Sequence, residues 1–142
     1  MDDFDLARYV DAQTPCYEQV VRELRSGRKR SHWMWFIFPQ FDGLALSSTS
    51  RLYAIKSLDE ARAYLAHPVL GPRLLECTRA VLDVRRSSAH DIFGSPDDIK
   101  FRSCMTLFEL VSGDNSLFAV ALERCFGGRR DARTLELVGN SD

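Results

Sequence analysis

Apolar residues recur at intervals of three and four along most of this 142-residue chain. This spacing places them on one face of an α-helix, whereas a half-buried strand would alternate every second residue. No segment shows a convincing two-residue alternation, and the chain contains no internal repeat or low-complexity segment. The pattern therefore predicts an all-α fold: a compact multihelical single domain over residues 1–142, with seven to eight short helices.

Turn and capping residues delimit the first two predicted helices. An amphipathic pattern spans residues 4–13. Thr14 and Pro15 follow, a pair that typically supplies the N-cap and first residue of a new helix. Gly27 is the expected end of that second helix, because glycine readily takes the left-handed conformation that ends helices.

Similar signals predict the later helices. Ser57 and Glu60 have the spacing of a capping box. Ser95-Pro96 with two acidic residues in the first turn is the strongest predicted helix start in the chain. The other predicted elements are a loop over 42–50, a helix over roughly 69–86, a single turn between Ser88 and Gly94, a helix capped by Asp114-Asn115-Ser116 and expected to be central because it is apolar on most sides, and a last helix over 132–138.

Positive charge and aromatic rings are concentrated in residues 26–43, SGRKRSHWMWFIFPQFDG. A basic cluster of Arg28, Lys29 and Arg30 precedes both tryptophans of the chain. Such a combination can anchor a phosphate and stack a flat ring. The alternative is a solvated helix end followed by a core segment, because basic residues also suit the C-terminus of a helix. Nearly every position of the HWMWFIF segment is apolar, so periodicity leaves both a short helix and an extended segment open.

The overall composition is that of an ordinary soluble domain, with 45% hydrophobic residues, 27% charged residues and a formal net charge of −1. This balance disfavours binding of nucleic acid over the whole surface, although it permits a local basic patch. The acidic N-terminus lacks the basic and apolar regions of a signal peptide. No run approaches the roughly 20 apolar residues of a membrane span. We therefore expect a cytoplasmic protein without a membrane partner, and predict no particular oligomeric state.

The cysteines indicate structural thiols rather than a metal site. They are far apart and form no CxxC pair, and the histidines do not cluster with them. Motifs for nucleotide cofactors or metal hydrolysis are also absent from the sequence, so no cofactor and no metal are predicted. The expected buried free thiols are those of Cys16, Cys77, Cys104 and Cys125.

The start of the helix after Pro96 is the second candidate for a binding surface. Lys100 lies at the edge of the buried face that begins at Phe101, where a lysine can line a cleft. We expect the aromatic segment to pack beside this helix start, with a tryptophan ring below Lys29, His32 and Lys100. No catalytic residue is singled out. The candidate ligand-binding residues are Lys29, Ser31, His32, Trp33, Trp35, Gln40, Asp97 and Lys100.

Six segments of the chain carry a resemblance to a known family: they lie within DLARYVDAQ (5–13), GRKRSHWMWFIFPQ (27–40), YAI (53–55), EA (60–61), HPVLG (67–71) and FGSPDDIKFRS (93–103). In these segments the chain resembles the domain-of-unknown-function 1810 family of bacterial and fungal proteins. The resemblance implies a compact, multihelical fold and no reaction. Some members are labelled "calpastatin", a class of long, disordered protease inhibitors that this short helical chain does not match.

A shorter likeness covers the second half of the chain. The spacing of Lys100, Met105, Phe108, Asn115, Leu122 and Asp131 is similar to the end of N-glycosidases that act on riboflavin-pathway intermediates and ADP-ribose adducts. The first half has no clear counterpart of the aromatic-Glu-His segment of those enzymes.

Three functional hypotheses follow. The first is binding of a small anionic or nucleotide-like ligand at a basic and aromatic cleft. The second is a protein-interaction module, in which the aromatic segment is core and the basic cluster meets an acidic partner. The third is an N-glycosidase-like activity on ADP-ribose or riboflavin-pathway compounds.

Overall fold

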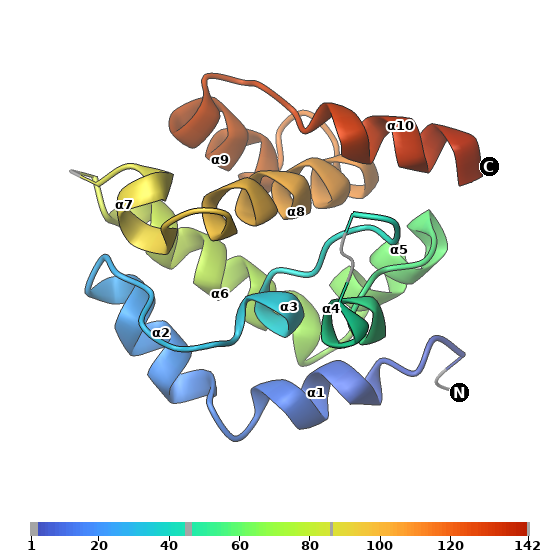
Figure 1. Ribbon diagram of the computed structural model, residues 1–142, viewed down its shortest axis with the longest axis horizontal. Coiled ribbons are helices and arrows are strands. Elements are labelled where there is room, and N and C mark those ends of the chain that lie inside the picture. Colours follow the sequence, from blue (N-terminus) through green and yellow to red (C-terminus); the bar gives the residue numbers. More distant parts are fainter. Residues whose placement is uncertain (1–2, 45–46, 86, 142) are drawn as a thin grey trace.

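The computed structural model describes residues 3–44, 47–85 and 87–141, which form ten helices and no strand (Figure 1). The all-α prediction is confirmed. The number of helices exceeds seven to eight because α3, α4 and α7 are short helices of four or five residues. The helices are α1 Ala7–Gln13, α2 Tyr17–Arg25, α3 Met34–Ile37, α4 Ser48–Leu52, α5 Leu58–Ala66, α6 Leu70–Asp83, α7 Ala89–Phe93, α8 Asp97–Ser112, α9 Leu117–Phe126 and α10 Ala132–Ser141.

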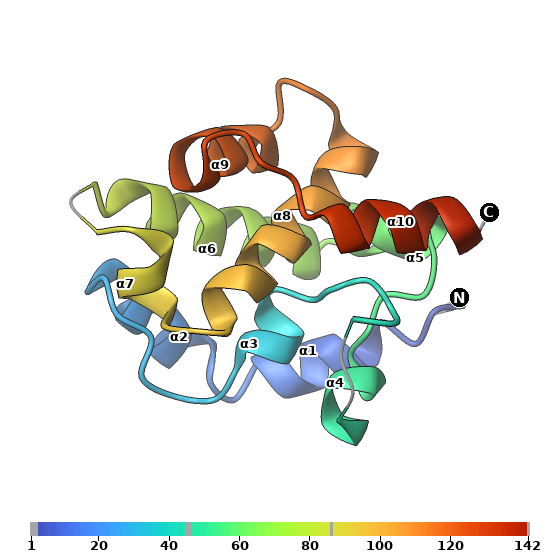
Figure 2. The same ribbon diagram turned by 45° about the horizontal axis from the view of Figure 1, so that its top comes forward.

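Helix α8 is the centre of the fold. Residues 103–109 are buried without interruption, so the helix is covered on every side for about two turns. It contacts α5, α7, α9 and α10. Figures 1 and 2 show α9 and α10 on one side of α8, and α1 to α3 on the other. The prediction that α9 would be central was wrong: this helix packs on the outside of α8, and its Val120 is 43% exposed.

An aromatic cluster joins the segment after α2 to the α7–α8 turn. The ring of Phe38 lies 5.8 Å from that of Phe93 and 5.0 Å from that of Phe101, both edge to face. Phe93 and Phe101 stack at 4.9 Å. Such ring pairs are favourable beyond the area that they bury. The cluster therefore fixes the aromatic segment beside the start of α8, which is the packing that the sequence led us to expect.

Two predicted helix starts were placed too early. Thr14 and Pro15 belong to the turn after α1, and α2 begins only after Cys16, which caps it without a side-chain hydrogen bond. Ser95 does not cap α8. Instead, Pro96, which follows a cis peptide bond, occupies the N-cap position, and Asp97 is the first helical residue.

Only one of the two hydrogen bonds of the predicted capping box forms at the start of α5. The Ser57 hydroxyl accepts from the backbone N–H of Glu60, as predicted. The Glu60 carboxylate instead accepts from the backbone N–H of Lys56 and from Arg8. A complete capping box is found at α7: the Ser88 hydroxyl accepts from the backbone N–H of Asp91, and the Asp91 carboxylate accepts from the backbone N–H of Ser88.

The predicted loop over 42–50 contains the beginning of a helix. Helix α4 begins at Ser48, because the Ser47 hydroxyl accepts a hydrogen bond from the backbone N–H of Ser50. The part of the predicted loop formed by residues 45 and 46 lies outside the described residues.

The thiols of Cys77 and Cys104 are fully buried, and burial raises the pKa of both, to about 12 for Cys77. Cys104→Ala is expected to lower the free energy of unfolding by about 1 kcal/mol, because it trims a small apolar group from α8. Urea denaturation measures this loss, with Cys16→Ala at a half-buried site as the control. Rapid labelling of Cys104 by a thiol reagent in the native protein would contradict its burial.

Candidate functional site

Two lysines from separate segments converge on the carboxylate of Asp97. The ammonium of Lys29 lies 2.9 Å from Asp97 Oδ2, and that of Lys100 lies 3.2 Å from Oδ1. Lys29 follows α2, whereas Asp97 and Lys100 occupy the first turn of α8. The side chains of Lys29, Asp97 and Lys100 are 10%, 19% and 25% exposed. We call this arrangement the two-lysine site.

Each lysine of the site also lies beside a tryptophan ring. The Lys29 ammonium is 5.3 Å from the ring centroid of Trp33, and the Lys100 ammonium is 5.6 Å from that of Trp35. Both distances are within the range of cation–π attraction. Trp33 is buried at 2% exposure, while Trp35 is half-buried within the four-residue helix α3. Of the two rings, only that of Trp35 therefore has surface to offer a ligand.

The segment that carries Lys29 is held by backbone geometry at the end of α2. Gly27 takes a φ of +83°, which turns the chain out of the helix. The backbone N–H of Lys29 then donates to the carbonyl of Ile92 in α7, at 2.7 Å. This hydrogen bond fixes the lysine beside the α7–α8 turn.

Glu23 holds the segment from Arg30 to Trp33 by hydrogen bonds, and the sequence analysis did not single it out. Its buried carboxylate accepts from the backbone N–H groups of Arg30 and Ser31, the Ser31 hydroxyl, the Trp33 indole N–H and Gln19. Burial opposes ionisation, but these hydrogen bonds outweigh it and lower the pKa of Glu23 to about 2. The available signal was a charged residue on the apolar stripe of α2.

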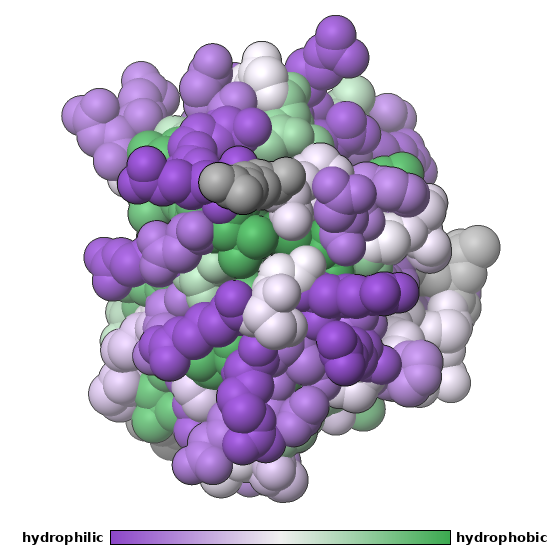
Figure 3. Space-filling view, turned by 90° about the vertical axis from the view of Figure 1, so that its left-hand side faces the viewer, coloured by the Kyte–Doolittle hydropathy of each residue, from purple (hydrophilic) through white to green (hydrophobic). Residues whose placement is uncertain are grey.

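A polar cleft of about 480 Å³ adjoins Lys29. His90 is one of the residues that line it, and its Nδ1 lies 3.3 Å from Asp98 Oδ2. Figure 3 shows that the end of the molecule containing α7 is largely hydrophilic, with small apolar areas between the polar side chains. The cleft is lined by Arg28, Lys29, His90, Asp91, Ile92, Phe93 and Gly94.

The other candidate residues do not join the two-lysine site. The Ser31 hydroxyl faces Glu23, at 2.6 Å. His32 is exposed, and among the described residues no hydrogen bond or ion pair engages its imidazole. Gln40 is half-buried, and its backbone carbonyl accepts from the N–H of Ile55 at 2.8 Å. The structure thus groups Lys29, Asp97 and Lys100 with the tryptophans, and leaves these three residues outside.

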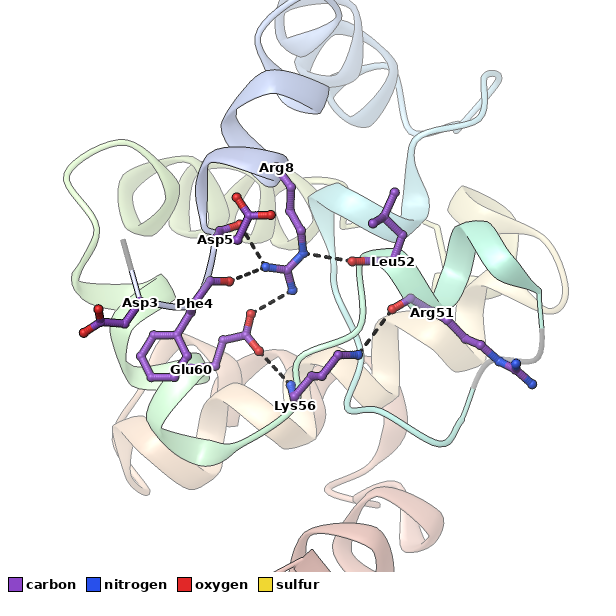
Figure 4. Close-up of a pocket in the computed structure, with 8 residues that line it drawn as sticks. All are labelled: Asp3, Phe4, Asp5, Arg8, Arg51, Leu52, Lys56 and Glu60. Atoms are coloured by element: carbon purple, nitrogen blue, oxygen red, sulfur yellow. Dashed lines mark hydrogen bonds and ion pairs between the residues drawn. The ribbon is translucent and has the colours of Figure 1, made fainter. Parts of the chain in front are cut away.

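A second cavity, of about 440 Å³, lies between the N-terminal segment, α4 and α5 (Figure 4). Arg8 crosses it and donates to the carbonyls of Phe4, Asp5 and Leu52 and to the Glu60 carboxylate. Its guanidinium therefore ties three segments together. Because the donors of Arg8 already have protein partners, this cavity is a weaker candidate for anion binding than the two-lysine site.

The glycine-rich connection before α10 serves as a helix link. Gly127 ends α9 in the left-handed conformation, and Arg130 pairs with Glu109. The carboxylate of Asp131 accepts from the backbone N–H of Thr134 at 2.9 Å, which caps α10. The aspartate of the glycosidase-like spacing thus has a structural role.

None of the helices in the described parts of the chain has the length and apolar character of a membrane span. Within the same residues, no three His, Cys, Asp or Glu side chains are grouped to hold a metal ion.

Comparisons with known proteins give a family but no activity. No curated protein sequence matches the chain. A crystal structure of the conserved hypothetical protein Rv1873 from Mycobacterium tuberculosis is 52% identical, with a TM-score of 0.95, and the match covers 97% of this chain and 99% of that one. The family model described as "Protein of unknown function (DUF1810)" matches residues 3–138. The chain therefore belongs to the DUF1810 family of proteins of unknown function.

Proposed function

We propose that this protein binds a small anionic ligand with a flat ring at the two-lysine site. The observation that carries this proposal is the convergence of Lys29 and Lys100 on Asp97. Two ammonium groups and one carboxylate leave a net charge of about +1 in a largely buried cluster. An anion that reaches this cluster is therefore attracted, and the attraction is screened less than at an exposed lysine.

The donors of the two lysines are not exhausted by Asp97. An ammonium group has three N–H donors, and each lysine directs one charged contact to the carboxylate. Remaining donors can bind phosphate or carboxylate oxygens, and such charge-assisted bonds are among the stronger ones in proteins. The ring of Trp35 is half-buried and lies 5.6 Å from the Lys100 ammonium, and its exposed part can stack a planar ring.

The protein-interaction hypothesis assigns binding to different residues of the same segment. Arg28 and Arg30 of the basic cluster are exposed, whereas Lys29 is largely buried. An acidic protein partner would engage the exposed arginines, and a small ligand would engage the lysines. No observation favours the N-glycosidase hypothesis, because Asp131 caps a helix.

Lys100→Ala is expected to weaken AMP binding by about tenfold or more, because it removes one charge-assisted contact. The melting temperature without AMP should change little, because Asp97 keeps its ion pair with Lys29 and no buried charge is left unpaired. Isothermal titration calorimetry gives the affinity, and a thermal-shift assay gives the stability. The matched control is Arg30→Ala, which removes an exposed cation from the segment that carries Lys29 and should leave AMP binding within about twofold.

Two results would overturn the proposal. One is a native protein whose melting temperature is unaffected by AMP, ADP and pyrophosphate at about 1 mM. The other is an AMP affinity that falls in Arg30→Ala and not in Lys100→Ala, which would transfer the binding to the exposed basic cluster.

A further inference from the structure

We infer that the ligand of the two-lysine site is a phosphorylated sugar or contains one, and that Asp97 accepts hydrogen bonds from two adjacent hydroxyl groups of that sugar. This inference rests on the proposed function and names the class of ligand. It begins with a feature that is unfavourable for anion binding, namely a carboxylate between the two lysines.

Asp97 opposes any ligand that is only an anion. Its two oxygens lie 2.9 and 3.2 Å from the ammonium groups. A phosphate oxygen in contact with either lysine therefore approaches Asp97 closely enough for like charges to repel. The repulsion is offset when the same ligand also brings hydrogen-bond donors to the carboxylate. The site thus favours ligands that combine an anionic group with donors.

Asp97 has the capacity to accept such donors. A carboxylate offers about four lone-pair positions, and the ion pairs with Lys29 and Lys100 direct one contact to each oxygen. The side chain is 19% exposed, so part of it is open to a ligand. Two donors on neighbouring atoms would fit the two oxygens of one carboxylate.

The donors must be neutral and close to the anionic group. A cationic donor would meet the two ammonium groups that flank Asp97, and would be repelled by both. Hydroxyl groups are neutral donors, and in a sugar phosphate they stand only a few bonds from the phosphate. The amino groups of a nucleobase lie on the far side of the ribose. Carboxylates accept ribose hydroxyls in the same way in dinucleotide-binding proteins.

The test compares D-ribose 5-phosphate with 2-deoxy-D-ribose 5-phosphate, which lacks one hydroxyl of the adjacent pair. The native protein should bind the first at least about tenfold more tightly, because the second leaves part of Asp97 unpaired. Inorganic phosphate should bind more weakly than either. Isothermal titration calorimetry measures all three affinities on the full chain.

Asp97→Ala should abolish the preference between the two sugars and should no longer disfavour inorganic phosphate. Asp98→Ala is the matched control, since it removes the neighbouring carboxylate, which pairs with His90, and should retain the preference. If Asp97→Ala does not fold, as judged by circular dichroism, the native protein's choice between the two sugars decides the question.

The outcomes separate the two proposals. Equal affinities of the native protein for both sugar phosphates would overturn the role of Asp97 and leave the anion site intact. Failure of the native protein to bind either sugar phosphate, AMP or pyrophosphate would overturn both proposals.

Discussion

Gly71→Ala is expected to destabilise the protein by about 3 kcal/mol, which corresponds to a fall of roughly 10 °C in melting temperature. Gly71 is the second residue of α6, where this helix crosses the end of α5. A Cβ atom at this position would lie 2.1 Å from the carbonyl oxygen of Leu65. Because the obstacle is backbone, the two helices must separate to admit one methyl group.

Gly139→Ala in α10 is the matched control. A Cβ atom there meets nothing within 4 Å, and alanine favours a helix over glycine by about 0.5–1 kcal/mol. The control should therefore be neutral or slightly stabilising, while Gly71→Ala is damaging. Thermal and urea denaturation of both variants measure the difference. If Gly71→Ala were as stable as the native protein, the close approach of α5 and α6 would be disproved.

Glu23→Ala is expected to cost about 3–5 kcal/mol near neutral pH. The substitution leaves the backbone N–H groups of Arg30 and Ser31 and the indole N–H of Trp33 without their acceptor. The segment that carries Lys29 should loosen as well, so AMP binding is expected to weaken together with stability. Glu18→Ala, at an exposed position of the same helix, is the control and should stay within about 0.5 kcal/mol of the native protein.

The Glu23 contribution also has a defined pH dependence. The folded-state pKa of about 2 lies below the ordinary value of 4.5. The ionised carboxylate therefore stabilises the folded protein by about 3 kcal/mol at pH values above 4.5. This stabilisation is lost as the pH falls from 4.5 toward about 2. Urea unfolding at several pH values from about 6 to about 3 measures the free energy of unfolding of both proteins. The difference in this free energy between native protein and Glu23→Ala should become smaller as the pH falls. A gap that stays constant over this range would show that the hydrogen bonds do not lower the pKa of Glu23.

The sequence by itself determined the helices, because their signals are local. Apolar spacing and caps act within one or two turns. Accordingly, the turn between Ser88 and Gly94 and the start of the last helix at Ala132 lie where the sequence placed them. Local signals failed where packing overrides them: Ser95 and Pro96 have a helix-starting composition, yet the turn before α8 places Pro96 at the N-cap.

Part of the candidate site was also readable from the sequence. A buried aromatic segment needs an apolar neighbour, which led to the expected grouping of Lys29, His32 and Lys100 beside a tryptophan. The cluster of Phe38, Phe93 and Phe101 brings Lys29 and Lys100 together in the structure, whereas His32 stays outside the site.

Only the tertiary structure decided which tryptophan is buried and which carboxylates bind the segment that carries Lys29. Trp33 at the N-cap of α3 is buried and Trp35 inside α3 is half-buried, and periodicity does not predict this difference because nearly every neighbour is apolar. The hydrogen bonds that Glu23 accepts depend on the direction of the backbone after α2. The ion pairs of Asp97 with both lysines depend on contact between segments far apart in the chain. These are long-range geometric facts. They arise when the helices dock, and no local pattern of residue types records them.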